Sequence, residues 1–359
     1  MLIRIRSAFV LALAVLACAQ QAWAQGPFTM GGVTAQPGTV VSGALNVPAG
    51  PGDQGTTIPF SILNGVRPGP VLGLIAGTHG SEYPPILALQ RLRSSIDPKD
   101  LSGTIVMVHV ANMVSFLGRT VYYSPVDHKN QNRVYPGRPD GTLSERVADA
   151  ISREVISRTD YLIDLHCGDG NESLVPYAYW STSGTPGLVD ACRQLAQAFG
   201  IEYILINPSR PIDPARTVSG TNTALARGKP ALTIEWGGMG QIDEESVAGI
   251  ARGVEGVLRH LKMRATGAPP LDHPVWLARN EVLTSGATGI WHPAVATGRL
   301  VSQGTLIGRI TDFWGVTVEE VRAPFDGVVL YVVGTPPTTK GEPLAGIAAR
   351  ATEADFPKK

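Results

Sequence analysis

Two short stretches of this sequence place histidine and carboxylate side chains where they could bind a metal ion. In the first, His79 and Glu82 stand three residues apart on a glycine-marked turn that follows the apolar run 71–76. In the second, His166 ends the apolar run 161–165. Zinc accepts imidazole nitrogen and carboxylate oxygen as ligands, and three protein ligands leave a fourth position for water. His79, Glu82 and His166 therefore predict a site for Zn²⁺, with one ion per chain.

The patterns around these residues predict the elements that bring them together. Residues 71–76 are typical of a buried parallel strand, and a helical pattern begins near Glu82. A second strand carries Asp164 and His166, whose side chains share one face because strand residues alternate. Ligands of open α/β sheets bind at the carboxyl ends of the strands. Asp164 could accept the spare N–H of a ligating His166, and the alternative is a buried carboxylate bonded to backbone.

Two further segments carry polar residues suited to catalysis or binding. An apolar strand ends in Glu235, and an ionised carboxylate is rarely buried without a partner. The irregular segment 111–138 contains Asn132 and Arg133. The planar guanidinium of Arg133 suits a substrate carboxylate, and Asn132 offers an amide donor beside it. The alternative is that Arg133 pairs with a nearby acid such as Asp127 and only anchors the loop.

Four motifs together resemble the zinc carboxypeptidase superfamily and, within it, most closely the succinylglutamate desuccinylase/aspartoacylase family. They are the His-x-x-Glu turn at 79–82, the Asn-x-Asn-Arg loop at 130–137, the Asp-x-His strand end at 164–166 and the strand 233–238 with its Glu. The motifs follow the family's order, and the resemblance covers about residues 55–350. It implies an α/β fold with a mixed, mostly parallel central sheet flanked by helices, as in zinc carboxypeptidases.

The resemblance also implies a chemistry. Such enzymes hydrolyse an amide bond with metal-activated water, and Glu235 matches the catalytic general base. Asn132 and Arg133 match substrate-binding positions, and Arg216 stands where the family often has another substrate-binding arginine. This favours a zinc-dependent N-acyl amino acid deacylase. An arginine found in members that cleave N-acetylaspartate is absent from residues 122–127, which argues against a doubly acidic substrate.

Two other functions remain as alternatives. A metallocarboxypeptidase would use the same residues on short peptides rather than on a small N-acyl amino acid. A periplasmic metal- or ligand-binding protein would keep the three metal ligands but would not need Glu235. The sequence contains no G-x-S-x-G, which disfavours a serine hydrolase. The glycines at 237–240 follow a predicted strand but lack the G-x-G-x-x-G spacing, which disfavours a dinucleotide enzyme.

The first residues predict export. Residues 1–24 have arginines, then a short apolar run, then Ala22-Trp23-Ala24, as in a signal peptide that is cleaved before Gln25. Cleavage before Cys18 is the alternative and would leave a lipoprotein. We therefore expect a periplasmic or secreted protein that contacts a membrane only if Cys18 is lipidated. The formal net charge of +0 offers no basic field for nucleic acid.

Changes in composition and residue pattern along the chain divide the mature protein into four segments. Residues 25–55 are rich in Gly, Pro and Thr and predict an irregular or β lead-in. Residues 56–265 predict the catalytic α/β domain, and residues 272–350 a C-terminal β domain. That domain resembles biotinyl and lipoyl barrels without their carrier lysine, which indicates a structural role, such as walling the active site. Residues 351–359 predict a loose tail. Export permits a disulfide between Cys167 and Cys192, but two buried free thiols are favoured.

Overall fold

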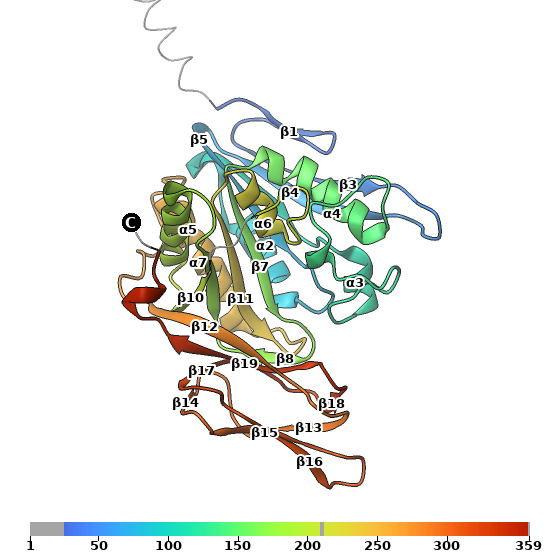
Figure 1. The fold of residues 1–359 in the computed structure, drawn as a ribbon. Coiled ribbons are helices and arrows are strands. Elements are labelled where there is room, and N and C mark those ends of the chain that lie inside the picture. Colours follow the sequence, from blue (N-terminus) through green and yellow to red (C-terminus); the bar gives the residue numbers. More distant parts are fainter. Residues whose placement is uncertain (1–24, 209–211, 358–359) are drawn as a thin grey trace, which may run out of the picture.

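The computed structural model describes residues 25–208 and 212–357. The expected signal peptide, Cys18 and the last two lysines lie outside the described residues. A mixed sheet of 13 strands runs through the molecule, with helices on both of its faces (Figure 1). The strand order is β14 (Leu300–Val301), β17 (Gly327–Val333), β19 (Pro343–Arg350), β12 (Val275–Thr284), β10 (Tyr203–Asn207), β9 (Tyr177–Ser181), β11 (Ala231–Gly238), β7 (Tyr161–Gly168), β5 (Arg67–Ala76), β6 (Ser102–Val108), β4 (Thr56–Asn64) and β3 (Thr39–Val47), while β8 (Glu172–Leu174) pairs with β17.

Six α-helices are formed by the described residues. They are α2 (Tyr83–Ser95), α3 (Met113–Gly118), α4 (Leu143–Glu154), α5 (Pro186–Phe199), α6 (Gly220–Ala226) and α7 (Glu244–His260). Helix α7 packs against both α2 and α5 in one layer, and α4 contacts α6 in another. The predicted α/β class is confirmed. None of these helices is long and apolar enough to cross a lipid bilayer.

Local chemistry explains where the central elements begin and end. β5 and β7 are apolar and buried along most of their length, as expected for parallel strands covered on both faces. Gly77 has a φ of 68° and closes β5 in a conformation that favours glycine. Proline follows directly in the first turn of α2, where a missing N–H removes no helical hydrogen bond. The turn that carries His79 and Glu82 is thus fixed on both sides.

The N-terminal lead-in adds strands to the sheet. β1 (Phe28–Met30) and β2 (Val33–Ala35) form a small hairpin, and β3 pairs along its full length with β4. The edge strand is therefore β3, and β4 lies between β3 and β6. A buried ion pair of 2.6 Å between Arg146 and Asp53 ties the lead-in to α4.

The C-terminal β region continues the central sheet. β12 pairs in parallel with β10 from Tyr203 to Leu205, so the sheet passes directly into β19 and β17. β13 (Gly289–Pro293), β15 (Leu306–Thr311), β16 (Thr317–Arg322) and β18 (Pro337–Thr338) form a second, four-stranded sheet. Figure 1 shows it at the end of the molecule away from β1. In the expected tail, Phe356 packs edge-on against Trp276 with ring centroids 5.6 Å apart.

Candidate active site

Three side chains that are far apart in sequence converge at the carboxyl ends of β5 and β7. His79 lies on the turn after β5, Glu82 is the N-cap residue of α2, and His166 lies near the end of β7. Their potential ligand atoms all lie within 4.8 Å of one another. Two imidazoles and one carboxylate are a donor set that suits zinc, so the residues present fit a metal ion. The predicted convergence of His79, Glu82 and His166 is confirmed.

The orientation of both rings fits this role. Glu82 Oε1 lies 2.9 Å from His79 Nδ1 and 2.9 Å from His166 Nδ1, so the two Nδ1 atoms face one point. The other ring nitrogens face outer partners, since His79 Nε2 lies 3.2 Å from Asn130 Oδ1 and His166 Nε2 lies 3.3 Å from Asp164 Oδ1. Outer partners of this kind fix the orientation of a ligating imidazole. Asp164 occupies the place that the alternation along β7 predicts.

The charges within this group are strongly coupled. Burial alone would raise the pKa of Glu82, but the two adjacent imidazoles outweigh it and hold that pKa well below its ordinary value. Burial would lower the pKa of His79 and His166, yet the carboxylate of Glu82 leaves both raised. A buried carboxylate between two imidazoles is thus kept ionised, which is the form that binds a cation.

A second carboxylate, half-buried, stands beside the metal-ligand group. Glu235 is paired with His166 in the parallel ladder of β11 and β7, and with Tyr177 in the antiparallel ladder of β11 and β9. Side chains at paired positions share one face, so Tyr177, Glu235 and His166 form a row across three strands. Burial, reinforced by the nearby carboxylates, raises the pKa of Glu235 well above its ordinary value. A carboxylate with a raised pKa is a stronger proton acceptor.

The loop between α3 and α4 brings the predicted substrate-binding residues to the same place. Asn132 Nδ2 lies 3.4 Å from His166 Nε2, and Asn132 Oδ1 is buried without a partner. Arg133 is exposed and lines the same cavity. The alternative pairing with Asp127 is not formed, because that carboxylate accepts hydrogen bonds from the backbone and hydroxyl of Ser144. Arg133 Nη1 donates a hydrogen bond of 2.7 Å to the carbonyl oxygen of Asn132, which leaves the other guanidinium N–H groups for a ligand.

One cavity of about 710 Å³ is lined by the metal-ligand group, by Glu235 and by the loop residues Asn132 and Arg133. Its walls include residues of the C-terminal β region, namely Asn280, Val282, Tyr331 and Pro343. The lining residues that were not selected from the sequence include Tyr122, Tyr123, Lys129, Tyr177, Tyr179 and Glu172. Tyr177 and Tyr179 belong to β9, whose alternation of aromatic and small residues is the signal that could have revealed the strand.

Other predicted residues lie elsewhere. Arg216 lines a separate cavity of about 230 Å³ together with Ser181 and Asn207, so the structure does not bring it to the metal-ligand group. Cys167 and Cys192 are both buried free thiols, as favoured from the sequence. Cys167 also lines the candidate active-site cavity.

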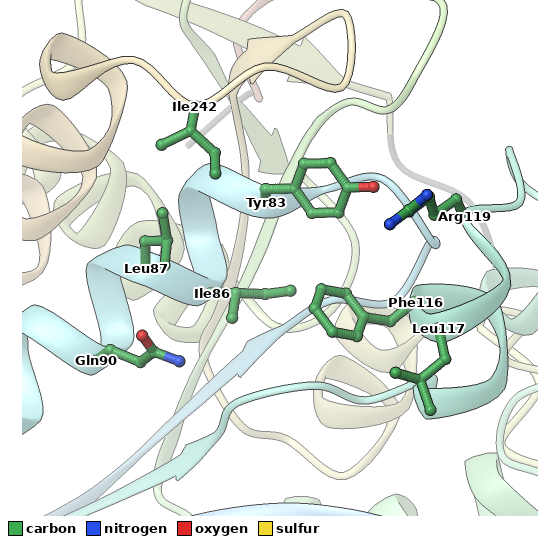
Figure 2. A pocket seen from close by; sticks show the side chains of 8 residues that line it. All are labelled: Tyr83, Ile86, Leu87, Gln90, Phe116, Leu117, Arg119 and Ile242. Carbon is green, nitrogen blue, oxygen red and sulfur yellow. The ribbon is translucent and has the colours of Figure 1, made fainter.

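A different hollow of about 440 Å³ lies between α2 and α3 (Figure 2). Figure 2 shows the ring of Phe116 next to Ile86, with Tyr83 beside both. Arg119 is the one charged side chain among its lining residues. An apolar hollow of this kind offers no acid–base pair, so the chemistry of the molecule is placed in the larger cavity.

Comparison with known proteins agrees with this geometry. Residues 68–261 match the family described as the succinylglutamate desuccinylase/aspartoacylase catalytic domain. N-alpha-acetyl-L-2,4-diaminobutyric acid deacetylase of Halomonas elongata is 32% identical over 269 residues, which cover 73% of this chain and 77% of that protein. Among solved structures, a succinylglutamate desuccinylase from Silicibacter sp. TM1040 has a TM-score of 0.79 at 28% identity, covering 91% of this chain and 98% of that one. The product-bound ectoine utilization protein EutE from Ruegeria pomeroyi has a TM-score of 0.78 at 27% identity, covering 90% and 98%.

Proposed function

Since this chain belongs to the succinylglutamate desuccinylase/aspartoacylase family, we propose that it is a zinc-dependent deacylase that hydrolyses the amide bond of an N-acyl amino acid. The observation that carries this proposal is the convergence of His79, Glu82 and His166 beside Glu235 in one cavity. The relative from Halomonas is named for removing an acetyl group from an amino acid, which is a reaction of this class.

The residues divide the chemistry between them. A zinc ion held by His79, Glu82 and His166 would lower the pKa of a water molecule and polarise the scissile carbonyl. Glu235 accepts the proton of the attacking water and returns it to the amide nitrogen as the carbon–nitrogen bond breaks. The water oxygen remains on the acyl carbon, so the products are a carboxylic acid and an amine. Asp164 holds the ring of His166 in place throughout.

The loop that carries Asn132 and Arg133 binds the substrate. The exposed fork of Arg133 can bind the α-carboxylate of an amino acid with two parallel hydrogen bonds. The wall of Asn280, Val282 and Pro343 closes one side of the cavity, which favours a small substrate over a longer peptide. We further propose export, on the strength of the signal-peptide pattern in residues 1–24.

A substrate panel tests the proposal. The mature protein is freed of metal, loaded with zinc, and assayed for released amine with N-acetyl and N-succinyl amino acids and with C-terminally free dipeptides. We expect hydrolysis of N-acyl amino acids that depends on zinc. Turnover of dipeptides with no hydrolysis of any N-acyl amino acid would instead support a metallocarboxypeptidase. Zinc binding without any hydrolysis would support a binding protein.

A further inference from the structure

Glu172 is a charged group in the active-site cavity for which the proposed mechanism has no use. It lies on β8 and lines the cavity together with Glu235. Its Oε1 accepts a hydrogen bond of 2.5 Å from the hydroxyl of Tyr122. Among the described residues this is its one hydrogen-bond partner, and no Lys, Arg or His forms an ion pair with it. One carboxylate oxygen of Glu172 is therefore left without a partner.

The backbone holds Glu172 firmly in this position. Met239 donates its N–H to the Glu172 carbonyl oxygen at 2.9 Å, and Val333 of β17 pairs with Glu172. A Cβ atom at Gly168 or Gly238 would come within 2.4 or 2.1 Å of that carbonyl oxygen, so glycine at both positions permits the close approach. With its backbone fixed and one carboxylate oxygen held by the Tyr122 hydroxyl, Glu172 is suited to recognition, because little freedom is lost when a ligand binds.

Tyrosine rings line the same part of the cavity. Tyr122, Tyr177, Tyr179 and Tyr331 are all lining residues, and the negative charge of Glu172 contributes to the raised pKa of each, after burial. These phenols stay neutral, and the face of a neutral aromatic ring attracts a cation. An unpaired carboxylate among aromatic rings is complementary to an alkylammonium group.

We propose that Glu172 and the surrounding tyrosines form a subsite for a primary ammonium group on the substrate. This inference rests on the proposed deacylase function and narrows it to N-acyl amino acids with a basic side chain. The ammonium group would lie against Glu172, while Arg133 binds the α-carboxylate and the scissile amide faces Glu235. Glu172 thus acts as a specificity-determining residue and not as the general base.

The test compares substrates that differ in one charge. Nα-acetyl-2,4-diaminobutyrate and Nα-acetylnorvaline have side chains of nearly equal size, and the first carries an ammonium where the second has a methyl group. Nα-acetylornithine and Nα-acetyllysine extend the series, and N-acetylaspartate reverses the charge. We expect the zinc-loaded protein to prefer a basic substrate over norvaline. In Glu172→Gln, kcat/KM for that substrate should fall about 10- to 100-fold, mainly through KM, because a charge-assisted contact is lost. For norvaline the change should stay within about threefold.

Matched variants separate recognition from structure. Glu281→Gln removes an exposed carboxylate from the strand β12, between the cavity-lining residues Asn280 and Val282. It should leave kcat/KM unchanged for both substrates. Tyr122→Phe removes the hydrogen bond to Glu172 but keeps the ring, and should retain the preference for the basic substrate. An equal loss for both substrates in Glu172→Gln would overturn the inference and would indicate that Glu172 only anchors Tyr122.

A binding measurement keeps the two proposals apart. Calorimetry on zinc-loaded Glu235→Gln measures the affinity of 2,4-diaminobutyrate and of norvaline without turnover. Tighter binding of the diamino acid, lost when Glu172→Gln is added, supports the subsite even if no N-acyl amino acid is hydrolysed and the proposed function fails. Equal binding of both amino acids overturns the subsite, and hydrolysis of neutral substrates would then leave the deacylase function standing.

Discussion

Glu235 is the direct neighbour of His166 in the parallel pairing of β11 with β7. The proposed general base and a proposed metal ligand therefore lie on adjacent central strands, and neither is positioned by a loop. Functional groups that are built on strands are held more precisely than groups on loops. The backbone ladder itself sets the separation between proton acceptor and metal site, which explains why both residues end apolar strands in the sequence.

Replacement of this base by its neutral isostere should remove catalysis but not metal binding. In Glu235→Gln we expect kcat to fall about 100- to 10,000-fold, the usual range for loss of a general base. The zinc content should remain one ion per chain, because Glu235 is not one of the three ligand residues. Metal analysis and steady-state kinetics on the same preparation check both points. Loss of the metal together with activity would contradict the assigned role.

Asp164 should act through His166 and not on the substrate. Its Oδ1 lies 3.3 Å from His166 Nε2, so it orients the imidazole from outside the metal-ligand group. In Asp164→Asn we expect zinc affinity to fall about 10- to 100-fold, as is typical when an outer partner of a ligating histidine is lost. Competition with a chromogenic chelator measures this affinity. An unchanged affinity with reduced kcat would instead place Asp164 in the catalytic step.

Removal of the metal should abolish hydrolysis and lower the melting temperature by several degrees. A ligand that binds only the folded state stabilises it by about 4 kcal/mol at 1,000 times its dissociation constant. Dialysis against a chelator, followed by calorimetry and by re-addition of Zn²⁺, checks the effect and its reversal. His166→Ala is the matched control, since a chelator should hardly change the melting temperature of a variant that binds the metal poorly.

The sequence predicted that His79, Glu82 and His166 would come together, because each lies at the end of an apolar strand or at the start of a helix. Runs of Val, Leu and Ile identify β5, β7 and β11, and the carboxyl ends of such strands form a common edge. The same logic located Glu235 and Asp164 without knowledge of the strand order. Arg133 was recognised from its motif, and its alternative ion pair with Asp127 is not formed, because that carboxylate accepts a hydrogen bond from Ser144.

The walls of the cavity could not be derived in this way. Tyr331 comes from the C-terminal β region and reaches the site only because β17 pairs with β8, a contact that no local pattern records. β9 is short and antiparallel to β11, so its position between β10 and β11 does not follow from its order in the chain. Glu172 is one of several acids after His166, and spacing alone selects none of them.

Arg133 should contribute to substrate affinity more than to the rate of the chemical step. It is exposed at the cavity and binds no carboxylate of the described residues. In Arg133→Ala we expect KM for an N-acyl amino acid to rise about tenfold with kcat little changed, since a charge-assisted contact to the substrate is lost in ground and transition states alike. Steady-state kinetics check this split. The same comparison with an N-acyl amine that lacks the α-carboxylate should show no difference between variant and parent.

Recognition of a basic substrate should depend on pH through Glu172. Burial raises the pKa of Glu172 to about 7, so its carboxyl is neutral in mild acid and charged in mild base. Because the charged form attracts an ammonium group, KM for Nα-acetyl-2,4-diaminobutyrate should fall as pH rises from about 6 to about 8, since that interval spans the raised pKa. KM for Nα-acetylnorvaline should not change with pH in this way. In Glu172→Gln, the pH dependence of KM should be the same for both substrates. A parallel pH dependence for both substrates in the parent protein would contradict the assignment.

The same raised pKa predicts an effect on stability. A carboxyl whose pKa is higher in the folded protein than in the unfolded chain supports folding below its ordinary pKa, and this contribution is lost as pH rises through about 7. Without a ligand cation, Glu172→Gln should therefore stabilise the metal-free protein at pH 8 by up to about 3 kcal/mol, and by less at pH 5. Denaturant unfolding at both pH values measures the difference, with Glu281→Gln as the control that should be neutral at each. Addition of 2,4-diaminobutyrate at pH 8 should make the parent protein more stable than Glu172→Gln, because the Glu172 carboxylate then gains an ammonium partner.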